Sequence, residues 1–206
     1  MPRVAVLILG VLAVLLVASQ LVLPAIAEHQ AQGRLEEGGG RADVEVKSLP
    51  ALRLLFGDGD RFEAVGRGLR LDVNRRGGDF DRLDGFGEVR VRLREMAAGP
   101  LDVRTFELTR SNGARDYDLR LRAITTPREL AGFVGSQAGG TLGGLFGDLA
   151  AGSLPGGGYT RVPLRLTARV ESRDGRPAVS AADGSLAGLP AGPLAELVLA
   201  AVVARI

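Results

Sequence analysis

The stretch Val162-Pro163-Leu164-Arg165-Leu166-Thr167-Ala168-Arg169-Val170 decides the fold class, because apolar and polar residues alternate strictly along it. A period of two places the two sets of side chains on opposite faces of a β-strand. Asp174-Gly175 is a dipeptide typical of a hairpin turn, and residues 178–181 predict the returning strand. We therefore expect antiparallel strands with one apolar face and one face in water.

The same alternation recurs upstream of this strand. Every second residue is apolar in five further segments: Val44 and Val46; Leu69, Leu71 and Val73; Val89, Val91 and Leu93; Leu101, Val103, Phe106 and Leu108; and Tyr117, Leu119 and Leu121. The phase slips by one residue at Thr105, which predicts a β-bulge. Because no helical pattern separates these segments, we expect antiparallel pairing and no parallel βαβ unit.

Two helices are expected in the first quarter of the chain. Residues 25–37 have a helical pattern that Gly38-Gly39-Gly40 ends. Residues 50–57 predict a shorter helix, with Pro50 in its first turn and Gly57 at a positive φ at its end. Leu52, Leu55 and Phe56 share the apolar face of this second helix.

A third helix is predicted to begin at Thr126-Pro127-Arg128-Glu129, where Thr126 and Glu129 have the spacing of a capping box. Apolar residues continue near helical spacing at Leu130, Phe133, Leu142, Leu145, Phe146 and Leu149, with seven glycines interspersed. Each interior glycine costs a helix about 1 kcal/mol. Two interpretations stay open: close packing of this segment on the sheet, or a flexible apolar lid over a cavity. A final helix is expected over 194–206, apolar nearly all round.

The run Val4–Leu23 is apolar except for Gly10, Ser19 and Gln20. As a helix it reaches about 30 Å, the thickness of a bilayer's hydrocarbon core. We therefore expect an N-terminal apolar helix and divide the chain into a leader, residues 1–27, and a single domain, residues 28–206.

Two interpretations of the leader stay open. As a signal anchor it keeps Arg3 and the terminal amine in the cytoplasm. As a cleavable signal peptide it has Pro24 as a helix breaker and Ala25-Ile26-Ala27 as a small-x-small site. Both place the domain on the extracytoplasmic side of the plasma membrane.

Composition argues against several kinds of site. The chain has no cysteine, which excludes disulfides and thiolate chemistry. Basic and acidic residues number 26 and 24, with seven Phe, two Tyr and no Trp, so no nucleic-acid partner is expected. Only Lys47 of the basic residues is a lysine, which we interpret as high-GC codon usage rather than as a guanidinium surface.

We also expect no enzyme, no metal and no cofactor. His29 is the only histidine and it lies in the segment just after the leader, so a histidine-based triad and a histidine-rich metal site are excluded. No G-x-S-x-G elbow occurs. Asp58-Gly59-Asp60 lacks the later ligands of a calcium loop and is interpreted as a polar turn. Asp79, Asp81 and Asp84 are interpreted as carboxylates in a solvated loop.

Several segments in order resemble a known family. These are the apolar leader, the strand Val44-Glu45-Val46 leading into Leu49-Pro50-Ala51-Leu52-Arg53-Leu54-Leu55-Phe56-Gly57, the Thr126-Pro127-Arg128-Glu129-Leu130 helix start, and Val162-Pro163-Leu164 with its Asp174-Gly175 hairpin. Together they resemble the LmeA-like phospholipid-binding proteins of the actinobacterial cell envelope. The resemblance implies binding of phospholipid, including phosphatidylinositol types, in support of mannan or lipoglycan elongation. It also implies an α+β fold, with a long curved antiparallel sheet wrapped around helices, as in a tubular lipid-binding half-domain of the bactericidal permeability-increasing type.

The residues themselves allow a slot for acyl chains, because each buried methylene contributes about 0.8 kcal/mol without any polar motif. We predict that the slot is lined by Leu52, Leu55, Phe56, Leu130, Phe133, Leu145, Phe146 and Leu149. Arg53 and Arg128 are the head-group candidates. A filled core lined by the same residues is the alternative for the interior, and a non-catalytic envelope scaffold that binds an unidentified protein partner is the alternative function.

Overall fold

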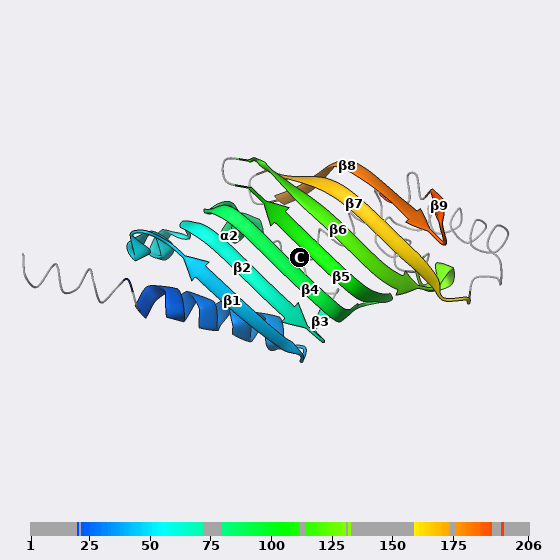
Figure 1. The fold of residues 1–206 in the computed structure, drawn as a ribbon, viewed down its shortest axis with the longest axis horizontal. Coiled ribbons are helices and arrows are strands. Elements are labelled where there is room, and N and C mark those ends of the chain that lie inside the picture. The colour runs from blue at the N-terminus through cyan, green and yellow to red at the C-terminus, as the bar shows by residue number, and fades with distance from the viewer. Residues whose placement is uncertain are drawn as a thin grey trace, which may run out of the picture.

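The computed structural model describes residues 20, 22–71, 80–111, 114–130, 132, 159–173, 176–190 and 195. Over these residues the chain is an α+β protein dominated by one mixed sheet (Figure 1). The strands are β1 (Arg41–Lys47), β2 (Gly59–Arg67), β3 (Arg70–Leu71), β4 (Phe86–Ala98), β5 (Leu101–Arg110), β6 (Asp116–Thr125), β7 (Val162–Arg173), β8 (Arg176–Leu186) and β9 (Leu189–Pro190). They are ordered β1-β2-β4-β5-β6-β7-β8-β9, and β3 pairs with β4.

Several helical elements accompany the sheet in the described ranges. The N-terminal helix covers residues 22–36 and is followed by glycines at 38–40, which confirms the predicted helix and its end. The 3₁₀ helix η1 (Ala51–Phe56) confirms the predicted short helix, and the one-turn helix α2 (Phe80–Asp84) precedes β4. At Thr126 the hydroxyl oxygen accepts a 3.2 Å hydrogen bond from the Glu129 N–H, so the predicted helix start is confirmed as well.

The alternating segments form one buried face. In β6 the side chains of Tyr117, Leu119 and Leu121 are buried, while the residues between them face water. β7 repeats this pattern with Leu164 and Leu166. The predicted bulge in β5 is confirmed by a shift of register between Val103 and Thr105. The sheet therefore has one apolar and one charged face, as the period of two requires.

The expectation of antiparallel pairing is wrong along one side of β4, where both β2 and β3 pair with it in parallel. β2 and β4 are parallel, with Arg61 opposite Glu88 and Arg67 opposite Arg94. β2 was not predicted, because small residues occupy its apolar positions. A Cβ on Gly66 would lie 2.7 Å from a Leu69 methyl carbon and 2.9 Å from one of Leu93, so no larger side chain fits without a shift.

A buried arginine ties the parallel crossover to the sheet. Arg110, only 8% exposed, donates hydrogen bonds to the carbonyl oxygens of Leu83 (2.9 Å), Asp84 (3.1 Å) and Phe86 around the end of α2. The carbonyls of Leu83 and Asp84 have no partner within so short a helix, and Phe86 is the first residue of β4. The Asp84 carboxylate accepts from Arg110 at 3.2 Å, from the Tyr117 hydroxyl at 2.8 Å and from the Ser172 hydroxyl. The interpretation of Asp84 as a solvated loop residue is therefore wrong, since its carboxylate compensates a buried charge.

We predict that Tyr117 makes the protein sensitive to alkali. Burial and the hydrogen bond to Asp84 raise the pKa of the Tyr117 phenol. Above about pH 10 the unfolded chain loses this proton and the folded chain keeps it, so the free energy of unfolding falls as pH rises. Tyr117→Phe should remove this alkaline loss, while losing about 1–3 kcal/mol at neutral pH with its hydrogen bonds. Urea unfolding at neutral and alkaline pH measures both effects, and an unchanged alkaline decline in the variant would contradict the role of Tyr117.

The N-terminal helix covers the β1 edge of the sheet. Glu28 Oε1 accepts a hydrogen bond from the Val46 N–H at 2.9 Å, and Glu36 Oε1 accepts one from the Ala42 N–H at 2.8 Å. An edge strand otherwise presents such amides as a template for another chain. The bond from Ala42 is the main reason that the pKa of Glu36 lies below its ordinary value, followed by the bond from Gln32. Ala27, Ala31 and Leu35 of the same helix pack against Val44 and Val46.

The edge contacts generate a second prediction. The double variant Glu28→Ala and Glu36→Ala should speed hydrogen exchange of the Val46 and Ala42 amides, because both lose their acceptors. Gln30→Ala, at an exposed position of the same helix, is the matched control. Acid should also weaken the protection of the edge amides in the unmodified protein. Because folding lowers the pKa of Glu36, the stability that its carboxylate contributes is lost as pH falls. Unchanged protection of both amides in the double variant would contradict the edge role.

Several expected elements lie outside the described residues. They are the apolar helix of the leader before Gln20, the strand beyond Leu71, the Asp174-Gly175 turn, the segment from 133 to 158 and most of 194–206. Among the helices that the structure does describe, none has the length and hydropathy needed to span a bilayer.

Candidate functional site

Most of the large exposed apolar side chains gather at one end of the molecule. Across the described ranges, eight large apolar side chains are exposed, and six of them belong to the start of the N-terminal helix or to η1 and the turn before it. These six, which we call the apolar cap, are Val22, Ile26, Leu49, Leu52, Leu55 and Phe56. Figure 1 shows η1 and the start of the helix at the same end of the sheet. Leu55 is 64% exposed and Phe56 is 83% exposed, so both lie in water rather than in the core.

Local sequence explains why η1 turns its apolar face outward. Gly57 ends the helix at φ 81°, and its N–H bonds back to the carbonyls of Arg53 and Leu54. Ala51 is fully buried, and Leu54 packs inward beside Val44 and Val46. Two residues of the short helix thus anchor it, and Leu52, Leu55 and Phe56 are left on the outer side.

The cap is joined to the N-terminal helix at the point where the apolar run ends. The Ala51 N–H donates a 3.0 Å hydrogen bond to Gln20 Oε1, and Leu54 packs in one cluster with Ala27 and Ala31. Gln20 and Val22 are among the last four residues of the run Val4–Leu23. η1 therefore lies beside the end of the run that we expect to enter a membrane.

The predicted acyl-chain residues do not all meet among the described parts of the chain. Leu52, Leu55 and Phe56 lie together in the apolar cap, on the outer surface. Leu130 is buried in the main core, in the helical turn that follows β6, and Figure 1 shows that β6 ends far from η1. Phe133, Leu145, Phe146 and Leu149 lie outside the described residues. Their role as slot residues stays a prediction. The apolar cap is a surface separate from the predicted slot, and the sequence pattern did not distinguish the two.

Both head-group candidates already have partners. Arg53 Nη1 lies 2.9 Å from Asp60 Oδ1, and both side chains are about half exposed, at 43% and 49%. Asp60 Oδ2 also accepts a hydrogen bond from the Leu49 N–H at 2.7 Å. Arg128 stacks on the Tyr159 ring at 4.9 Å and donates to its hydroxyl. An incoming phosphate would have to share Arg53 with Asp60. The contacts of Arg128 given above are with Tyr159, which carries no negative charge to compensate the guanidinium group.

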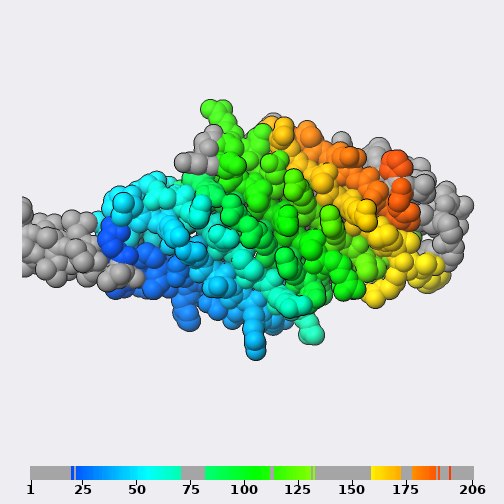
Figure 2. Space-filling view, in the orientation of Figure 1, coloured from blue at the N-terminus to red at the C-terminus, as the bar shows by residue number. Residues whose placement is uncertain are grey.

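The water-facing side of the sheet is densely charged. Ion pairs cross it between Arg61 and Glu88 (2.6 Å), Arg92 and Glu63 (3.8 Å), and Arg169 and Asp118 (3.9 Å). Figure 2 shows this side as a continuous surface of side chains from β1 to β8. Within the described ranges, no group of three His, Cys, Asp or Glu residues could hold a metal ion.

We predict that the apolar cap contributes little to stability. Replacing both Leu55 and Phe56 by serine should change the free energy of unfolding by less than about 0.5 kcal/mol per residue, because both side chains are mostly exposed. Leu121→Ala, a buried control, should cost about 2–5 kcal/mol. Urea unfolding of the three proteins measures the difference. A loss in the double variant as large as that of the core control would show that the cap belongs to the core.

No family model, no curated protein and no solved structure matches this chain.

Proposed function

We propose that this protein is an exported or membrane-anchored phospholipid-binding protein that meets a bilayer through its apolar cap. The observation that carries the proposal is the cap itself, six large apolar side chains exposed together where the apolar run joins the domain. A soluble protein does not usually expose such a cluster unless it marks an interaction site.

The energetics favour a lipid surface as the partner of the cap. Moving a Leu or Phe side chain out of water contributes about 1.5–3 kcal/mol when its burial is complete. Arg53 borders the cap, and a long basic side chain beside apolar residues can keep its charge at the level of the head groups. The run Val4–Leu23 would hold the cap at the membrane, whether the leader stays as an anchor or acts during export only.

The finer proposal concerns the acyl chains. We propose that they lie on the apolar side of the sheet, in a slot of the tubular lipid-binding type, with Leu130 and the predicted residues from Phe133 to Leu149 along it. The resemblance to LmeA-like proteins supports this assignment and adds envelope lipid or lipoglycan assembly as the context. No catalytic role is part of the proposal, because the sequence offers no converging acid, base and nucleophile.

Extraction of the purified chain tests the proposal. The full-length protein is washed extensively in mild detergent and extracted with organic solvent, and the extract is analysed for phospholipid by mass spectrometry and phosphorus content. We expect about one phospholipid per chain to survive washing, as anticipated for acyl chains enclosed by protein. Residues 1–27 fused to an unrelated soluble domain are the control for lipid that merely surrounds the leader, and should lose it.

The contrary result is equally specific. If the full chain retains no more phospholipid than the control fusion, the acyl-chain slot is wrong. A stoichiometric protein partner in the same preparation would then favour the envelope scaffold.

A further inference from the structure

Three arginines form a line across the water-facing side of the sheet, and we propose that they bind a soluble anion carrying at least two phosphate groups. The three are Arg94 of β4, Arg122 of β6 and Arg165 of β7, which we call the arginine row. All three are exposed and lie on the face opposite the core.

The register of the sheet places these residues in one line. Arg94 is opposite Thr105 of β5, Thr105 is opposite Arg122, and Arg122 is opposite Arg165. Neighbouring strands are about 4.8 Å apart, so the row spans roughly 14 Å, and Arg122 and Arg165 are direct neighbours.

The row differs from the rest of the charged face. Arg61, Arg92 and Arg169 each have an acidic partner within 4 Å, at the distances given above. In the described parts of the chain, none of the three row residues makes such a pair. Three acids lie near the row. Glu95 follows Arg94 and its charge interacts with Arg94, but its carboxylate pairs with Arg67 at 2.7 Å. Glu107 is opposite Arg92 and Arg120, and Asp102 is 3.5 Å from Arg104 and 3.7 Å from Arg161.

Such an arrangement opposes folding. Like charges directly opposite each other on neighbouring strands destabilise a sheet. The sequence supplies acids to the other cations on this face but not to Arg122 and Arg165. A bound anion would supply the missing negative charge.

The chemistry favours phosphate over carboxylate. A guanidinium group binds either oxyanion through a planar fork of two N–H donors. A carboxylate carries a single charge and would compensate one arginine, whereas a phosphate carrying more than one charge can compensate Arg122 and Arg165 together. Arg94 lies two strands from Arg122, which is why a second phosphate group is required.

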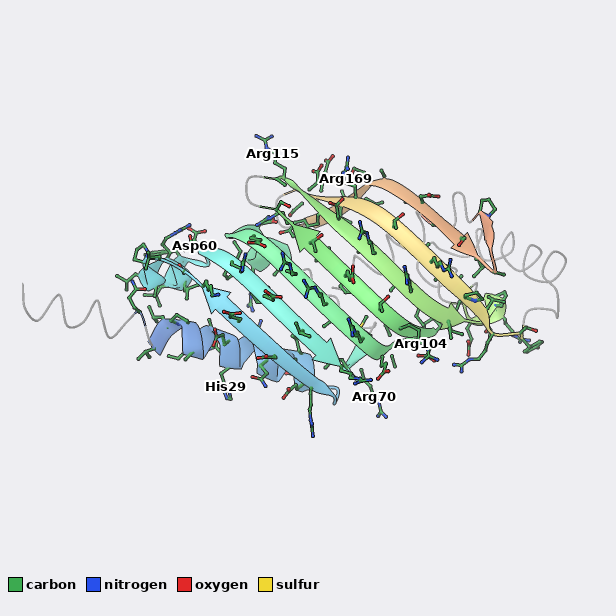
Figure 3. The ribbon with its side chains drawn as sticks, in the orientation of Figure 1. His29, Asp60, Arg70, Arg104, Arg115 and Arg169 are labelled. Atoms are coloured by element: carbon green, nitrogen blue, oxygen red, sulfur yellow. The ribbon has the colours of Figure 1, made fainter. Side chains whose placement is uncertain are left out.

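The position of the row indicates a soluble ligand. Figure 3 labels Asp60, the partner of Arg53 beside the apolar cap, at the upper left of the sheet, and Arg104, the chain neighbour of Thr105, right of centre at its lower edge, so the two lie well apart. A bilayer that receives the cap would therefore lie away from the row. The assignment of a soluble ligand, rather than a lipid head group, rests on the proposed function. The binding of phosphate by the arginine row does not.

Calorimetric titration of the full-length chain in detergent with inorganic tripolyphosphate tests the proposal. We expect saturable binding that Arg122→Gln with Arg165→Gln weakens by about tenfold or more, as expected for the loss of charge-assisted hydrogen bonds. The matched control, Arg92→Gln with Arg169→Gln, removes two charges from the same face and should change the affinity less than about threefold. Equal losses in the two double variants, or no saturable binding, would overturn the proposal.

Four further measurements keep the result interpretable. Arg122→Glu should abolish binding without lowering the melting temperature, because it places an acid opposite Arg165. Orthophosphate should bind at least about tenfold more weakly than tripolyphosphate, and equal binding would overturn the requirement for two phosphates. The Leu55→Ser and Phe56→Ser variant should retain tripolyphosphate binding, so a failure of the cap as a membrane site leaves this result intact. If vesicles of anionic phospholipid compete for the arginine row as strongly as tripolyphosphate does, the assignment of a soluble ligand is wrong.

Discussion

The hydrogen bonds between the N-terminal helix and the edge of β1 fix the position of everything that we connect with function. Glu28 and Glu36 accept the edge amides of Val46 and Ala42, and eight residues before Glu28 the side chain of Gln20 accepts the amide of Ala51. All three acceptors belong to one helical segment. A single helix therefore closes the sheet edge and holds η1 beside the end of the apolar run.

The two faces of the sheet divide the remaining tasks. The apolar face buries the alternating side chains and receives α2, which Arg110 fastens through the carbonyls at its end. The opposite face is charged, and most of its arginines are paired with acids along the register. The apolar cap lies at one end of this two-sided structure. Exposed apolar groups are thus collected at one end, and unpaired positive charge lies on the water-facing side of the sheet.

The sequence predicted the parts of the fold that depend on local pattern. The alternation in β4 to β8, the bulge near Thr105, the glycine end of the N-terminal helix and the Thr126 cap all follow from short-range rules, and the structure contains them. It did not predict β2, because Ala64 and Gly66 give no apolar signal, and hence it missed the parallel pairing. Arg110 looked like any other exposed arginine at the end of a strand. An amphipathic helix with Leu52, Leu55 and Phe56 on one face predicts burial, and only the packing of Ala51 and Leu54 shows that this face points outward. The arginine row likewise depends on register across strands that are distant in the sequence, so composition alone suggested codon usage.

We expect the cap to enter a bilayer while the charged face of the sheet stays in water. The chain has no cysteine, so single spin labels can be placed without altering any other residue. The most direct measurement compares labels at Leu55→Cys and Thr167→Cys in the full-length chain, reconstituted in phospholipid vesicles, by their collision with oxygen and with a water-soluble nickel complex. We expect the label at position 55 to collide mainly with oxygen, which concentrates in the hydrocarbon, and the label at position 167 to collide mainly with nickel. Equal and high nickel accessibility at both positions would contradict it.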